Sequence, residues 1–114
     1  MAEIAVLYVF LHCDIEHSEQ IIYTMSKELT IEDIQEIVAK DESRYLELKQ
    51  STGELYKAMT SACAFLNTDG GWVMFGITPK LKIVGQNVTD PTRQEIANAL
   101  RKFEPAIDIP VQYV

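Results

Sequence analysis

The fold is decided by a stretch in which a helix ends, a glycine turn follows and an apolar strand begins: Ala64-Phe65-Leu66-Asn67-Thr68-Asp69-Gly70-Gly71-Trp72-Val73-Met74-Phe75-Gly76-Ile77. The two adjacent glycines can adopt positive φ and so form a turn. Residues 72–77 are apolar on both faces, which is typical of a strand in the middle of a sheet. Before the turn, residues 54–67 repeat apolar side chains at helical spacing and predict an amphipathic helix.

Helical and strand-like segments alternate on both sides of this stretch. Thr30 offers an N-cap for one helix, and Asp90 is the expected N-cap of another with Pro91 at its first position. Residues 72–85 are expected to form a hairpin through a turn near Pro79. The predicted strands cover residues 2–11, 45–49, 72–77, 82–85 and 107–114, and the predicted helices cover 31–39, 54–67 and 91–104.

These elements indicate an α+β fold built on a single mixed sheet of about four to five strands with about three helices on one side. The 114 residues are enough for one ordinary domain. A normal apolar content disfavours disorder, and no apolar run approaches the roughly 20 residues that span a bilayer. The beginning of the chain lacks the basic region of a secretion signal, so we expect a cytoplasmic, soluble protein.

The charge of the chain is unevenly distributed. Ten Lys and Arg face 17 Asp and Glu, which gives a net charge of -7 and by itself argues against a nucleic-acid partner. Residues 1–40, however, hold eight acids and two bases, whereas residues 41–114 hold nine acids and eight bases. The second segment is therefore nearly neutral and has enough cations for a local basic patch.

The densest group of charges is Glu42-Ser43-Arg44-Tyr45-Leu46-Glu47-Leu48-Lys49, with the pattern E-x4-E-x-K. Period-two alternation places Leu46 and Leu48 on one face and Glu47 and Lys49 on the other. Two converging carboxylates, Glu42 and Glu47, could hold Mg²⁺ or Mn²⁺, while the lysine could neutralise a phosphate. The alternative is a solvated strand face with an internal ion pair between Glu47 and Lys49.

Two other groups of residues were considered as sites, a glycine turn and the cysteines with their neighbouring histidines. Backbone amides in the turn of Asn67, Thr68, Gly70 and Gly71 could face an anion, although a purely structural turn explains the glycines equally well. The cysteines Cys13 and Cys63 do not form a disulfide framework. His12, Cys13 and His17 do not match the ligand spacing of a zinc site.

Several of these motifs together resemble the AlbA_2 domain of the Schlafen superfamily. They are E-x4-E-x-K, the amphipathic helix after it, A-F-x-N-T-x-G-G, a strand that ends in F-G-I, and I-V-G a few residues later. The resemblance runs from about Ile31 to Val114, so residues 1–24 are expected to be an atypical N-terminal extension. Residues 25–114 would then form the domain, with its C-terminal edge incomplete.

The resemblance implies a DNA-binding module of a larger transcriptional regulator or RecG-like helicase-related protein. Schlafen proteins that cleave RNA use three carboxylates and a divalent metal, and Glu42, Glu47 and Lys49 match two of the acids and the basic position. Thr78 stands where the third acid is expected. Asp69 would lie about 15 Å away, at the other end of its strand, too far to share an ion.

Three hypotheses follow from the sequence. The first is nucleic-acid binding, to DNA or structured RNA, without a required cofactor, through basic residues in the second segment: Arg44, Lys49, Lys57, Lys80 and Lys82. The second is a nuclease that depends on Mg²⁺ or Mn²⁺ bound by Glu42 and Glu47. The third is a protein-interaction domain. No membrane partner is expected, and the strand at 107–114 could pair with a second copy of the chain.

Overall fold

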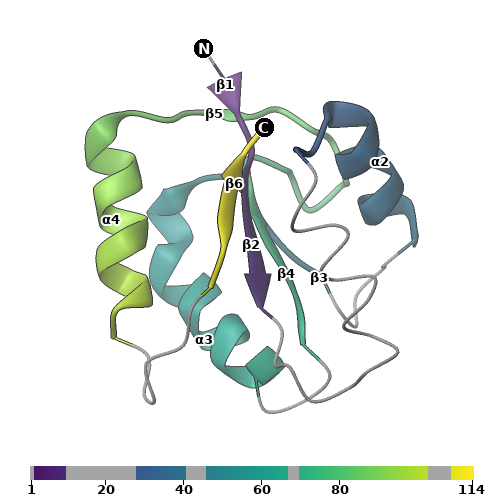
Figure 1. Ribbon diagram of the computed structural model, residues 1–114. Helices are drawn as coiled ribbons and strands as arrows, with labels where there is room; N and C mark the ends of the chain where they lie inside the picture. Colours follow the sequence, from purple (N-terminus) through teal and green to yellow (C-terminus); the bar gives the residue numbers. More distant parts are fainter. Residues whose placement is uncertain (1, 10–27, 41–45, 67–69, 103–108) are drawn as a thin grey trace.

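A computed structural model of the chain describes residues 2–9, 28–40, 46–66, 70–102 and 109–114 (Figure 1). The strands are β1 (Ala2–Glu3), β2 (Ala5–Val9), β3 (Leu46–Lys49), β4 (Gly71–Phe75), β5 (Gln86–Asn87) and β6 (Val111–Tyr113). The helices are α2 (Ile31–Lys40), α3 (Leu55–Leu66) and α4 (Asp90–Leu100), with a short 3-10 turn η1 (Thr52–Glu54) before α3. The α+β class and the mixed sheet predicted from the sequence are confirmed.

The main sheet has the strand order β3-β4-β2-β6. β3 and β4 are parallel and are joined by α3, whereas β2 runs antiparallel to both of its neighbours. Every residue of β2 and β4 is buried, as expected for central strands whose two faces are both covered. β2 comes from the segment that precedes the Schlafen-like motifs, and it nevertheless lies in the middle of the sheet.

Helices cover both faces of this sheet, so the expectation that they all lie on one side is wrong (Figure 1). Side chains alternate along β2: Val6 and Tyr8 pack toward α2, while Ala5, Leu7 and Val9 pack toward α3 and α4. The apolar stripe of α2 shows that the helix packs against something apolar, but the sequence of the helix does not reveal which face of the sheet it covers. Only the pairing of strands from distant segments decides that.

The predicted hairpin over residues 72–85 is confirmed at its turn, where the Thr78 amide donates to the Lys82 carbonyl at 2.9 Å, but residues 82–85 form no strand beside β4. Ile77 and Ile83 form an isolated bridge, and the chain then leads into β5, which pairs with β1 as a separate two-stranded sheet. Gly76 and Gly85 both have positive φ, at 108° and 71°. The carbonyl of Gly76 accepts the amide of Gly85 at 2.8 Å, so the two glycines lie back to back. Residues 82–85 cannot pair further along β4, because β3 and β2 already occupy its two edges.

The start of α4 differs by one residue from the sequence expectation. Thr89, not Asp90, is the N-cap, and its side chain and that of Thr92 form a reciprocal capping box. Asp90 then places its carboxylate in the first turn, where it stabilises the positive end of the helix dipole. Pro91 follows in the first turn, where its missing amide costs nothing.

Candidate nucleic-acid interface

The charged face of β3 is formed by Glu47 and Lys49, as the alternation predicted. Leu46 packs into the core under α2, and Glu47 and Lys49 point to the opposite face, level with Val73 and Phe75 of β4. The Lys49 Nζ lies 2.9 Å from the Glu47 Oε1, and their side chains are 15% and 31% exposed. The Lys49 charge is therefore partly compensated within its own strand.

Lys49 lies where the parallel strands β3 and β4 end together. Its carbonyl accepts the amides of Gly76 and Ile77, at 2.8 and 3.2 Å. The residues after this point form the loop from Thr78 to Lys82, whereas after β3 the chain enters η1 and then α3. Both parallel strands thus deliver their following segments to one end of the sheet.

Three further lysines come from these following segments. Lys57 is in the first turn of α3, and Lys80 and Lys82 are in the loop after β4. All three are exposed, in contrast to Lys49. We call Lys49, Lys57, Lys80 and Lys82 the basic end; the name refers to these four lysines and not to a net charge, because Glu47 and Glu54 come from the same segments. The sequence named each of the four lysines as a nucleic-acid contact, and the topology brings them to the same end of the sheet.

Hydrogen bonds hold the segments of the basic end together. The amide of Thr52 in η1 donates to the side-chain oxygen of Gln86 in β5 at 2.8 Å, and the Gln86 side chain donates back to the Thr52 hydroxyl at 3.2 Å. The segment after β3 is therefore tied to the segment that follows the Thr78–Lys82 loop. Such links give the end of a sheet a defined shape for recognition.

Thr78, at the position where the family's third acid is expected, has a structural role in its loop. Its hydroxyl accepts the amide of Lys82 at 3.1 Å, and its own amide donates to the carbonyl of Lys82 at 2.9 Å. Both interactions close the loop on itself. This hydroxyl is neutral and has one oxygen, which already accepts a hydrogen bond, whereas a carboxylate would supply a negative charge and two oxygens.

The glycine turn before β4 packs tightly against the end of α3. Gly70, with φ at 93°, donates its amide to the carbonyl of Phe65 at 3.0 Å, as glycines do at helix ends. A Cβ at Gly71 would come within 2.7 Å of the Phe65 ring. The Gly70 amide that an anion would need is thus already used, which favours the structural explanation of this turn.

Several of the residues named from the sequence lie outside the described residues. They are Glu42, Arg44, Asn67, Thr68 and Asp69, together with His12, Cys13 and His17. Within the described ranges, no three His, Cys, Asp or Glu side chains converge in a way that could hold a metal ion. The metal site that would include Glu42 stays a prediction.

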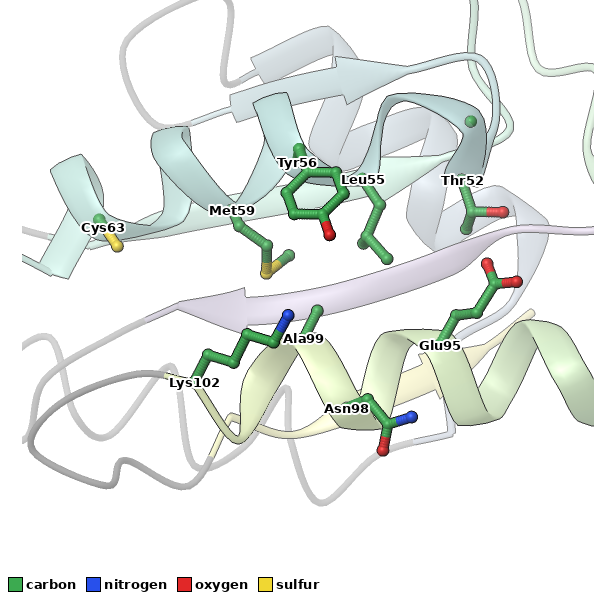
Figure 2. Close-up of a pocket in the computed structure, with 10 residues that line it drawn as sticks. Thr52, Leu55, Tyr56, Met59, Cys63, Glu95, Asn98, Ala99 and Lys102 are labelled. Atoms are coloured by element: carbon green, nitrogen blue, oxygen red, sulfur yellow. The ribbon is translucent and has the colours of Figure 1, made fainter.

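A groove between α3 and α4 was not found from the sequence. Figure 2 shows Tyr56, Met59 and Lys102 around this groove, which has a volume of about 460 Å³. The Lys102 Nζ lies 5.8 Å from the centre of the Tyr56 ring, and Glu95 points toward Thr52 at the other end. The one signal in the sequence was Tyr56, an aromatic residue outside the apolar stripe of its predicted helix.

A parallel β-α-β unit inside a mixed sheet, with lysines gathered where the parallel strands end, defines an α+β domain with a basic end. The family model described as Schlafen, AlbA_2 matches residues 42–114, which is more than half of the chain. The chain therefore belongs to the Schlafen AlbA_2 family, as the resemblance predicted, and this membership supports a nucleic-acid-binding domain. No curated protein and no solved structure matches the chain.

The matched region contains the whole basic end, but it includes neither α2 nor β2. The central strand of the sheet thus lies outside the family match. None of the helices in the described ranges has the length and apolar character needed to cross a membrane.

Proposed function

We propose that the chain is a DNA-binding module of a larger, cytoplasmic protein of the transcriptional-regulator type, and that it binds through the basic end. The observation that carries the proposal is its membership of the Schlafen AlbA_2 family, whose matched residues include all four lysines. Electrostatic contacts with phosphates supply most of the affinity in non-specific nucleic-acid binding. Binding requires no metal or other cofactor in this proposal.

The distribution of charge around Lys57 supports this location. The exposed face of α2 carries Glu32 and Glu36, and Glu28 lies just before this helix. α2 covers the opposite face of the sheet from α3 (Figure 1). Glu32 and Glu36 therefore lie across the sheet from Lys57, which is on α3. Lys80 and Lys82 lie nearer to α2, because Ile77 and Ile83 on either side of them pack in the same cluster as that helix. A local basic surface can bind phosphate in a protein whose total charge is negative.

Fluorescence anisotropy with a labelled DNA duplex and a labelled RNA hairpin tests the proposal. We expect DNA binding at low salt that weakens steeply between about 50 and 200 mM salt, because counterions are released from the phosphates. Replacing Lys80 and Lys82 with Gln is expected to reduce the slope of log affinity against log salt by about two. Tighter binding to the RNA hairpin would contradict the choice of DNA.

A charge-matched control separates local from general electrostatics. Arg101 follows α4, whose last turn lies at the opposite end of the fold from the segment between β4 and β5 (Figure 1), and its guanidinium donates to the Asn98 side chain in that turn at 3.1 Å. Arg101→Gln removes a charge of the same sign and is expected to leave the salt slope nearly unchanged. A slope that falls equally for Arg101→Gln and Lys80→Gln would contradict binding at the basic end. An absence of binding by the unmodified chain would favour a protein-interaction domain.

The competing function is a nuclease that uses Mg²⁺ or Mn²⁺ with Glu42, Glu47 and Lys49. The presence of Thr78 where the third acid is expected, and its use within its own loop, favour binding over cleavage. Incubation of labelled RNA and DNA with Mn²⁺ distinguishes the two. Cleavage that Glu47→Ala abolishes would establish the nuclease, whereas equal cleavage by this variant would indicate a contaminating enzyme.

A further inference from the structure

The loop after β4 presents a leucine to solvent between two lysines. Leu81 is the residue with φ at 67°, the one non-glycine residue with positive φ in the described part of the chain, and it is 43% exposed. Lys80 and Lys82 on either side of it are exposed as well. The loop lies at the end of the sheet from which the chain continues to β5 (Figure 1).

This conformation is unfavourable for leucine. A left-handed backbone costs an L-amino acid about 1–2 kcal/mol, and an exposed leucine recovers little of this through burial. Residues held in such conformations cluster at binding and switch sites, where the surrounding structure maintains them. The turn itself sets this backbone conformation, because the residue that closes a short hairpin loop usually has positive φ. What the turn does not explain is the choice of leucine at a position that favours glycine or asparagine.

The loop is held rigidly by its own hydrogen bonds. The amide of Leu81 donates to the carbonyl of Thr78 at 2.9 Å, and the hydroxyl and amide of Thr78 both bond to the backbone of Lys82. Directly below, Ile77 and Ile83 form a bridge. The side chain of Leu81 is thus presented from a closed, supported turn, which lowers the entropy lost when it enters a partner.

The combination of an apolar tip and flanking cations matches the chemistry of duplex DNA approached from the minor groove. Proteins that bend DNA insert leucine or similar side chains between base steps, while lysines and arginines bind the adjacent phosphates. Single-stranded nucleic acids are instead bound by aromatic side chains that stack on the bases. No aromatic residue occurs in the sequence between Gly76 and Gly85.

We propose that Leu81 is a wedge that enters a base step of duplex DNA from the minor groove, with Lys80 and Lys82 on the neighbouring phosphates. The proposal rests on the DNA-binding function proposed above and adds a mode of binding and a preference. Pyrimidine–purine steps such as TA unstack most easily. The complex is therefore expected to form preferentially at these steps and to contain kinked DNA.

The test uses the full chain and two duplexes that contain 2-aminopurine, one beside a central TA step and one within a run of A·T pairs. Insertion of Leu81 unstacks the reporter base and raises its fluorescence at the TA step. Leu81→Gly is expected to abolish this rise and to weaken binding to the TA duplex about tenfold, which corresponds to about 1.4 kcal/mol. Its salt slope is expected to stay unchanged, because no cation is removed.

Glycine is the informative replacement because it adopts positive φ without strain. Leu81→Gly should therefore fold as well as the unmodified chain, and thermal unfolding checks this. Leu81→Met keeps an apolar wedge and is expected to keep the fluorescence rise. Val84→Ala shortens another exposed apolar side chain, three residues further along the chain, and is expected to have no effect.

Each contrary outcome identifies what has failed. If the unmodified chain binds DNA but Leu81→Gly binds equally and gives the same fluorescence, the wedge is wrong and DNA binding stands. If the unmodified chain does not bind either duplex, the proposed function fails and the wedge fails with it. Binding to vesicles of anionic lipid that depends on Leu81, without any change in 2-aminopurine fluorescence, would overturn the wedge in favour of a membrane contact.

Discussion

The two ends of β4 are both marked by glycine, and the structure uses them differently. At the beginning of the strand, Gly70 and Gly71 fit closely against Phe65 at the end of α3. At its end, Gly76 allows the backbones of Glu3 and Gly85 to cross beside it. The first contact joins neighbouring segments, whereas the second joins segments from opposite parts of the chain.

This difference shows why a glycine motif alone does not identify a binding site. The turn with Gly70 and Gly71 was a candidate anion site, but at both ends of the strand the group that approaches the glycine is another part of the same chain. Only the end marked by Gly76 continues into an exposed loop with lysines. The glycines there build the support for that loop, and the side chains beyond them are the residues available to a partner.

The largest expected effect is that of Gly76→Ala. The new Cβ would lie 2.9 Å from the Ile4 Cδ1, 3.0 Å from the Gly85 Cα and 3.2 Å from the Glu3 carbonyl oxygen, on a backbone with φ at 108°. Two of these neighbours are backbone atoms and cannot rotate away. We expect the free energy of unfolding to fall by about 3 kcal/mol, as measured by urea denaturation.

Gly53→Ala is the control for this prediction. Its Cβ would meet the Ser51 side-chain oxygen at 3.2 Å, and this exposed side chain can rotate. The change in stability is expected to stay below about 1 kcal/mol. Equal losses for the two variants would mean that the crossing at Gly76 is not tightly packed.

Gly71→Ala is expected to cost less, about 2 kcal/mol, because the clash involves a side chain and not the backbone. The new Cβ would lie 2.7 Å from the Phe65 ring. The double variant Phe65→Leu/Gly71→Ala should lose less stability than the sum of the two single variants. Additive losses in denaturation experiments would show that the two positions do not contact each other.

A substitution of Tyr8 tests the packing of the core beside the beginning of β4. Its ring packs on Trp72 with centroids 4.8 Å apart, it is 2% exposed, and its hydroxyl has no hydrogen-bond partner among the described residues. Tyr8→Phe removes a buried polar group and is expected to stabilise the fold by about 1 kcal/mol. A loss of stability in urea would show that the hydroxyl has a favourable interaction.

The same tyrosine predicts how stability depends on pH. Burial, and secondarily the Asp33 carboxylate, raise the pKa of the Tyr8 hydroxyl above its ordinary value of 10.0. The unfolded chain therefore releases this proton first as the pH rises, and stability falls above about pH 10. The pKa of tyrosine in the unfolded chain is about 10. Between about pH 9 and pH 11, Tyr8→Phe should therefore lose less stability than the unmodified chain.

The smallest expected effect is that of Leu81→Gly on stability. Relief of the left-handed strain favours the variant, and the greater freedom of glycine in the unfolded chain opposes it. The balance is expected to be a stabilisation of about 0.5 kcal/mol. A loss of more than about 1 kcal/mol in thermal unfolding would mean that the leucine packs usefully within the free domain.

Local patterns predicted most of the regular elements. The helical spacing over 54–67 and the capping residue Thr30 correctly predicted α3 and α2, and period-two alternation correctly placed Leu46 and Glu47 on opposite faces. These features depend on residues within a few positions of one another, so the sequence displays them directly. The hairpin after β4 formed only at its turn, because β3 and β2 occupy both edges of β4 and the chain pairs instead, at β5, with β1, more than 80 residues away along the chain.

The sequence by itself determined most of the elements, the apolar character of β4 and the identity of the four lysines, because each is a property of a residue or a short repeat. Tertiary structure decided that β2 lies between β4 and β6, that helices cover both faces, and that the four lysines come to one end. Pairing between distant segments is selected by the burial of the whole core, which no local pattern encodes.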